Sequence, residues 1–338
     1  MHGDALLSVL LAGGLSFAAA LGCSSEDAGT TAGDSGPTAT EAGDDARDDT
    51  AREDAAGNDA GDDAAREDAG LDASEDADDG GTGGDASDGE VTPPGFPWGG
   101  AIDPNGDPSS AREVARPLGS TSAPQGFYEY TPAGYPGSAK WPLLIALHGV
   151  GENGNGASEL DELRDTGLGH LIGRDKWPND RPFVVLRPQH AGGGCPSSSE
   201  IHAFITWGLE NYAIDPHYVY LTGLSCGAIG SWSYLANHLD AQIAAFVSIA
   251  GNGKSAWNSK GCDLGKVAIW AFHGDADPTV DVSGTNVPLD GLAGCPAPPA
   301  LESKKTIYPG VGHDSWSRTY DGSAGHDVFS WMLGFKRP

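Results

Sequence analysis

One stretch of the chain, residues 218–235, limits the possible folds more than any other. It opens with the apolar and β-branched run Val219-Tyr220-Leu221, continues as Gly-Leu-Ser-Cys-Gly, and ends in apolar residues at helical spacing. This pattern predicts a buried strand, a sharp turn with Ser225 at its apex, and a helix. Such a turn strains the apex residue and exposes its hydroxyl, while the flanking glycines let strand and helix pass closely. We therefore predict Ser225 as a nucleophile and the N–H of Cys226 as an oxyanion donor.

The rest of the chain after residue 94 alternates buried strands with amphipathic helices. Strands are predicted at 127–130, 141–148, 183–187, 245–250, 267–272 and 306–308, and helices at 159–171, 199–212 and 328–335. Continuous apolar runs such as residues 141–148 are typical of strands buried on both faces. The predicted fold class is α/β, with a mainly parallel sheet covered by helices on both faces, in a single domain over residues 94–338.

The N-terminal part has a different composition. Residues 6–21 are apolar and small, too short for a spanning helix and followed by Gly22-Cys23, so residues 1–23 are predicted to be an export signal, of the lipoprotein type with a lipid on Cys23. Residues 24–93 are rich in Asp, Ala and Gly and nearly free of large apolar side chains. They cannot bury enough apolar surface to offset backbone entropy, so we expect a disordered linker.

The strongly negative charge belongs mostly to that linker. Of the net charge of −29, residues 24–90 carry −20 through 23 acidic residues and three arginines. The remaining −9 is ordinary for a soluble domain, and no basic patch is present, so we expect no nucleic-acid partner. Membrane contact is expected only through a lipid at Cys23.

Three further motifs follow predicted strands, where open α/β sheets place their sites. The first, residues 148–154, is a glycine-rich loop whose Val150 N–H is our second oxyanion donor. The second, residues 273–281, holds Asp275, Asp277 and Asp281, and the third holds His313. Serine needs a base, His313, and the base needs a carboxylate. We favour Asp277 because Pro278 stiffens its turn.

These motifs together resemble a known family. LHGVGENG (147–154), GLSCGAIGSW (223–232), WAFHGDADPTV (270–280) and YPGVGHDSW (308–316) are similar to α/β-hydrolase esterases of the dienelactone hydrolase and phospholipase/carboxylesterase type, including secreted poly(3-hydroxybutyrate) depolymerase-like and feruloyl-esterase-like enzymes. The resemblance implies the α/β-hydrolase fold, with Asp277 of Asp-Pro-x-Val as the acid of the triad. The chain departs from the family at Cys226, where Met or Gln is frequent, and at Ala228, where Gly is frequent. The resemblance therefore does not predict the shape of the acyl pocket.

Other residues of catalytic type are interpreted as structural. His326 lies in a second Gly-His-Asp but precedes the final helix, so we expect a cap or surface residue. His148 and His273 are expected to pack loops beside the site. Trp232 and Trp316 are candidates for a substrate cleft or for the core. No zinc-binding spacing occurs, and we predict neither a metal nor a cofactor.

Four cysteines remain after Cys23, and in an exported chain an even number predicts disulfides. Three pairings are possible. Cys262 and Cys295 bracket the strand before Asp277 and its loop, so we expect these two to pair. A thiol nucleophile at Cys226 is disfavoured because Ser225 is at the apex.

The predicted activity is that of an exported serine esterase acting by acyl transfer through Ser225, His313 and Asp277. The expected partner is a carboxylic ester, with polymer and plant-wall-type esters among the candidates. Two alternatives stay open: a serine peptidase of the same fold, and a non-catalytic surface protein that binds polymers through a vestigial hydrolase domain.

Overall fold

The computed structural model describes residues 106–239, 243–296 and 301–337. The predicted export signal (1–23) and linker (24–93) lie outside the described residues. The strands are β1 (Glu113–Arg116), β2 (Phe127–Tyr130), β3 (Trp141–Leu147), β4 (Val184–Pro188), β5 (Ile214–Leu224), β6 (Ile243–Ile249), β7 (Ala268–Gly274) and β8 (Ser303–Tyr308). The α-helices are α1 (Gly167–Gly173), α2 (Ser198–Asn211), α3 (Cys226–Asn237), α4 (Lys254–Lys260), α5 (Ser283–Ala293), α6 (Trp316–Tyr320) and α7 (Val328–Leu333). Short 3₁₀ helices are η1 (Ser109–Arg112), η2 (Val150–Glu152), η3 (Leu160–Arg164) and η4 (Gly261–Lys266).

The eight strands of the described residues form one sheet in the order β1-β2-β4-β3-β5-β6-β7-β8. The first two pairings, β1 with β2 and β2 with β4, are antiparallel, and the remaining five are parallel. The predicted mainly parallel sheet is therefore confirmed. Because β3 to β8 all run in one direction, the loops that leave them meet at the same edge of the sheet.

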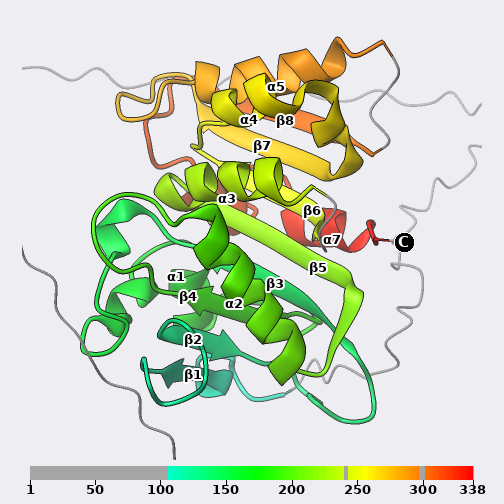
Figure 1. Ribbon diagram of the computed structural model, residues 1–338. Coiled ribbons are helices and arrows are strands. Elements are labelled where there is room, and N and C mark those ends of the chain that lie inside the picture. The colour runs from blue at the N-terminus through cyan, green and yellow to red at the C-terminus, as the bar shows by residue number, and fades with distance from the viewer. Residues whose placement is uncertain (1–105, 240–242, 297–300, 338) are drawn as a thin grey trace, which may run out of the picture. The chain divides into compact units, whose positions relative to one another are not determined.

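Helices cover both faces of the sheet (Figure 1). On one face α2, α3, α4 and α5 pack on side chains such as Leu143 and Ile145, and on the other α1, α6 and α7 pack on neighbours such as Leu144. Alternate residues of β3 therefore face opposite layers, yet every residue of the strand is buried. Each such Leu or Ile contributes about 1.5–3 kcal/mol by leaving water.

Some elements differ from the sequence prediction. The helix predicted over 159–171 is divided into η3 and α1, because Gly167 between them adopts a φ of +55°. Gly167 also packs closely on Leu224: a Cβ at this position would lie 2.8 Å from the Leu224 side chain. Helix α5 was not predicted; it carries Pro288 in its interior and two glycines. The short β1, α4 and α6 were also missed. Within the described part of the chain, no helix has the length and apolar character needed to cross a bilayer.

Candidate active site

The link between β5 and α3 has the geometry expected of a nucleophile turn. Ser225 has φ 49° and ψ −116°, a conformation that residues with a side chain rarely adopt. Its N–H donates to Ile249 O at 2.9 Å, which fixes the turn against β6. A Cβ on Gly227 would lie 2.4 Å from Leu147 O, so only glycine allows the start of α3 to pack this closely on β3.

The structure brings Ser225, His313 and Asp277 together in a hydrogen-bonded row. His313 follows β8 in the sequence, and its Nε2 lies 2.9 Å from Ser225 Oγ. Its Nδ1 lies 2.7 Å from Asp277 Oδ2, in the loop that follows β7. If Nδ1 carries the proton and donates it to the carboxylate, Nε2 is left free to accept the Ser225 hydroxyl.

The Asp277 carboxylate is completely buried, and its two oxygens have separate partners. Oδ1 accepts the N–H groups of Thr279 at 2.8 Å and Val280 at 3.0 Å, which orients the group. Burial would raise the pKa of Asp277, but the hydrogen bonds from His313, Val280 and Thr279 outweigh it, so the pKa lies below its ordinary value. The group therefore stays ionised at neutral pH.

The other carboxylates of that loop have different partners. Asp275 accepts the N–H of Gly310 in the loop after β8, and Asp281 accepts the N–H of Ser283 at the start of α5. His273 is fully buried and lies between Thr285 Oγ1 and Val280 O, each at 2.8 Å. Its Nε2 is also 3.1 Å from Asp277 Oδ2. It thus packs the Asp277 loop, which agrees with the structural role expected for it.

A second histidine–carboxylate pair lies in the loop after β3. His148 Nδ1 donates to Gly149 O at 2.6 Å, and Nε2 accepts the N–H of His190 at 2.9 Å. Burial lowers the pKa of His148 to about 4, so the ring is neutral at pH 7. Glu152 Oε2 is 4.0 Å away from His148 Nδ1, and burial raises the pKa of this carboxyl group.

The two predicted oxyanion donors each open a helical turn. Cys226 is the first residue of α3, and Val150 is the first residue of η2. N–H groups at such positions have no acceptor within their own helix and are available to a ligand. Val150 is 56 % exposed, so it can contact a bound molecule.

Of the remaining aromatic and histidine candidates, two have a structural role and one lies at the candidate site. Trp232 is buried, and its Nε1 donates to Ser248 Oγ, so it belongs to the core. His326 packs on the rings of Trp270 and Phe272, and the cap of α7 is the neighbouring Asp327. Trp316 alone reaches the candidate site, with its ring perpendicular to that of His313 at 5.1 Å.

Two disulfides are present among the described residues. The predicted Cys262–Cys295 bond is confirmed. The second joins Cys195 to Cys226, the residue after Ser225. The sequence analysis left the state of these two cysteines open; once Cys262 and Cys295 are paired they are the remaining two, and the structure shows that they bond.

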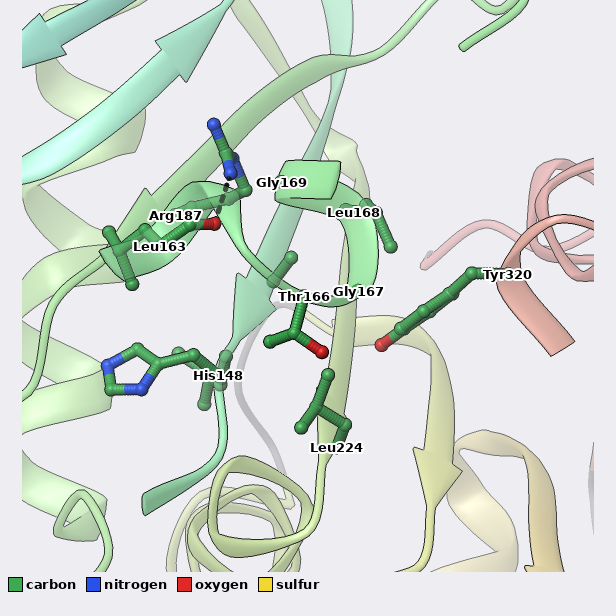
Figure 2. A pocket seen from close by; sticks show the side chains of 11 residues that line it. His148, Leu163, Thr166, Gly167, Leu168, Gly169, Arg187, Leu224 and Tyr320 are labelled. Carbon is green, nitrogen blue, oxygen red and sulfur yellow. Dashed lines mark hydrogen bonds between the residues drawn. The ribbon is translucent and has the colours of Figure 1, made fainter. Parts of the chain in front are cut away.

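Two hollows are lined by sequence neighbours of the triad residues, Leu224 in one and Asp314 in the other, and by none of the three triad residues themselves. The cavity behind Leu224 measures about 20 Å³, and Figure 2 shows Thr166, Leu224 and Tyr320 pointing toward one another around it. That volume suits about one water molecule. A surface hollow of about 340 Å³, lined in part by Trp316, Asp314 and Thr166, is large enough for part of a small organic ligand. Across the described ranges, no cluster of three or more His, Cys, Asp or Glu side chains is arranged to hold a metal ion.

This chain is similar to known proteins in structure. No protein-family model and no curated protein matches the chain. A thermostable esterase is 23 % identical with a TM-score of 0.51, covering 67 % of this chain and 64 % of its own, so the likeness spans less than two thirds of that protein.

Two further solved structures are less similar. A feruloyl esterase module from Clostridium thermocellum, complexed with sinapinate, is 18 % identical over 71 % of this chain and 96 % of its own, with a TM-score of 0.47. An acetyl xylan esterase from Aspergillus awamori is 18 % identical over 60 % and 94 %, with a TM-score of 0.43. Only the first comparison has a TM-score that supports a shared fold. Together with the sheet order and the strained turn at Ser225, it shows that this chain has the α/β-hydrolase fold.

Proposed function

We propose that the protein is a serine esterase that hydrolyses carboxylic esters through an acyl-enzyme. The observation that carries the proposal is the row Asp277–His313–Ser225, with 2.7 Å and 2.9 Å between the bonded atoms. Nucleophile, base and orienting acid are each within hydrogen-bond reach, as this chemistry requires.

The proposed reaction has two halves. Ser225 Oγ attacks the ester carbonyl carbon while His313 Nε2 accepts the hydroxyl proton, and ionised Asp277 stabilises the resulting imidazolium. The N–H groups of Cys226 and Val150 stabilise the oxyanion. His313 then gives its proton to the departing alkoxide, which leaves as the alcohol. Water, deprotonated by His313, attacks the acyl-enzyme, and the acid leaves as Ser225 regains its proton.

The surface hollow beside Trp316 is the proposed position of part of the substrate. It borders His313 through the Trp316 ring and is far larger than the cavity behind Leu224. We also propose that the protein works outside the cytoplasm, because its two disulfides persist only in an oxidising compartment. Recovery of the protein in the cell-envelope fraction tests this proposal, and the intact mass of that protein shows whether Cys23 carries a lipid.

Turnover of short p-nitrophenyl esters tests the activity. Ser225→Ala is expected to fold normally and to lose at least ~10³-fold in kcat, because only binding and the oxyanion donors remain. A folded variant that keeps most of its turnover would contradict the proposal. Comparable cleavage of peptide amides would favour a peptidase, and inactivity of the wild-type domain on every ester class would favour a binding protein.

A further inference from the structure

The Cys195–Cys226 disulfide joins two segments that border the candidate nucleophile. Cys226 is the first residue of α3, directly after Ser225, and Cys195 lies near the end of the loop between β4 and α2. The two Cα atoms are 4.9 Å apart. A covalent bond therefore connects one predicted oxyanion donor to a loop that carries none of the triad residues.

That loop has little packing of its own. Residues 191–194 read Ala-Gly-Gly-Gly and are exposed. Gly192 and Gly194 have φ +89 and +90, and a Cβ added to either glycine, or to Gly193, would meet no atom within 4 Å. Glycines in open space lose much conformational entropy when ordered and gain few contacts in return. The position of this loop must therefore depend on what holds its two ends.

The same loop holds the segment that carries Val150. Five hydrogen bonds join residues 148–154 to the loop after β4: His190 N to His148 Nε2 at 2.9 Å, Gly154 N to His190 O at 3.0 Å, Gln189 Nε2 to Glu152 O at 3.1 Å, and Asn153 Nδ2 to Gly192 O at 2.9 Å and to Gly194 O at 3.0 Å. Within η2 itself, the Glu152 N–H bond to Gly149 O is long, at 3.4 Å. The position of the Val150 N–H thus depends on the loop after β4.

The other end of the disulfide is rigid. The start of α3 packs on β3 through Gly227, and Ser225 N is bonded to β6. Farther along α3, a Cβ on Gly230 would lie 2.6 Å from Pro196 O. Pro196, the residue after Cys195, therefore also packs closely on the helix. The disulfide therefore ties a flexible glycine loop to a fixed point beside the nucleophile.

We infer that Cys195 is a positioning residue: its disulfide to Cys226 holds the glycine loop, and through Asn153 the Val150 segment, so that the two oxyanion donors keep a fixed separation. This inference rests on the proposed esterase function. Displacement of a catalytic donor by about 1 Å can cost up to ~10²-fold in rate, and loss of one donor costs ~10²–10³-fold. The bond should consequently affect turnover more than substrate binding.

The second disulfide provides a matched control. Cys262–Cys295 spans 33 residues against 31 for Cys195–Cys226, so the two bonds restrict the unfolded chain to a similar extent. Cys262 lies in η4 and Cys295 follows α5, and neither segment carries a residue of the candidate site. Cys195→Ala and Cys295→Ala each remove one bond and leave one free thiol.

The experiment measures kcat and KM for p-nitrophenyl acetate, the thermal midpoint, and Ki for a short alkyl trifluoromethyl ketone, whose adduct on serine carries an oxyanion. Cys195→Ala is expected to lower kcat ~10–100-fold with KM within about twofold, and to raise Ki by a similar factor. Cys295→Ala should keep kcat and Ki within about twofold while its midpoint falls comparably.

If Cys195→Ala does not fold, Asn153→Leu tests the same connection with both disulfides intact. It should lower kcat and raise Ki several-fold, roughly in parallel. Unchanged kcat and Ki in whichever variant folds, or equal losses in Cys195→Ala and Cys295→Ala, would overturn the inference and leave the esterase proposal standing. Absence of any turnover in the wild-type protein would overturn both.

Discussion

Two histidine–carboxylate pairs lie at the same edge of the sheet and differ in how the carboxylate is held. In the pair after β8, His313 Nδ1 is 2.7 Å from Asp277, and Asp277 Oδ1 accepts two further N–H groups. In the pair after β3, His148 Nδ1 is 4.0 Å from Glu152 and donates instead to a backbone carbonyl.

The difference shows how the backbone selects a function for the same residue types. Burial would raise the pKa of Asp277, but hydrogen bonds from His313 and from two backbone N–H groups hold it below its ordinary value, so an ionised carboxylate is available to stabilise the imidazolium of His313. Burial raises the pKa of Glu152 and lowers that of His148, so neither group in the second pair favours a charge. His148 is suited to bracing the loop, and His313 to accepting a proton.

The largest expected effect comes from Asp277→Asn. An amide cannot hold the Nδ1–H tautomer or stabilise the imidazolium, so kcat should fall ~10³–10⁴-fold with the fold unchanged. Steady-state kinetics on a p-nitrophenyl ester measure it. Asp275→Asn and Asp281→Asn are the controls, because these carboxylates bond Gly310 and Ser283 instead, and each should cost less than about tenfold. An active Asp277→Asn beside a crippled control would reassign the acid.

His148 should make the fold sensitive to acid. Its pKa is about 4 in the fold against 6.5 as a free side chain, so between these values the unfolded chain binds a proton that the folded chain does not. Acidification therefore favours unfolding, by about 3 kcal/mol for this group between pH 7 and pH 4.

His148→Gln tests that dependence, because an amide can both donate to Gly149 O and accept from His190 N without titrating. Urea unfolding at pH 7 and pH 4.5 should show a smaller loss of unfolding free energy in the variant than in the wild type. Identical losses in the two proteins would mean that His148 titrates normally. We expect kcat at pH 7 to fall less than about tenfold, since His148 is not the base.

The smallest effect is expected from Glu152→Gln. The variant removes a buried carboxylate whose raised pKa indicates a cost of ionisation, so stability at pH 7 should rise or stay level. Turnover should stay within about tenfold of the wild type. A loss of turnover as large as that of Asp277→Asn would show that the second pair takes part in the chemistry.

The parts of the fold that sequence predicts best are those with one dominant physical signal. Residues 141–147 form a continuous apolar run, which has few alternatives to a strand buried on both faces, and β3 lies there. The sequence also predicts the strand–turn–helix around Ser225, because the apolar runs on either side and the two glycines all indicate a sharp turn between a strand and a helix. Asp277 and His313 follow β7 and β8, which are neighbouring parallel strands. Loops that leave parallel strands meet at one edge of the sheet, and this rule predicts that the two residues lie close together.

The missed features depend on tertiary packing. Helix α5 contains Pro288, which argues locally against a helix, yet its Leu289 and Leu292 are buried in the core. The break before α1 arises from the approach of Gly167 to Leu224, which no local pattern reveals. The Cys195–Cys226 bond requires the strand order β4-β3-β5, which places the loop after β4 near α3, and the cysteine spacing alone does not reveal that order.

Labelling with a fluorophosphonate tests most directly that His313 with Asp277, and not His148 with Glu152, activates Ser225. The reagent loses fluoride as an activated serine oxygen bonds to phosphorus, and peptide mass spectrometry locates the adduct. We predict an adduct on Ser225, formed at least ~10³-fold more slowly in His313→Gln and less than about tenfold more slowly in His148→Gln. An adduct on another residue, or equally rapid labelling of Ser225 in His313→Gln, would contradict this account.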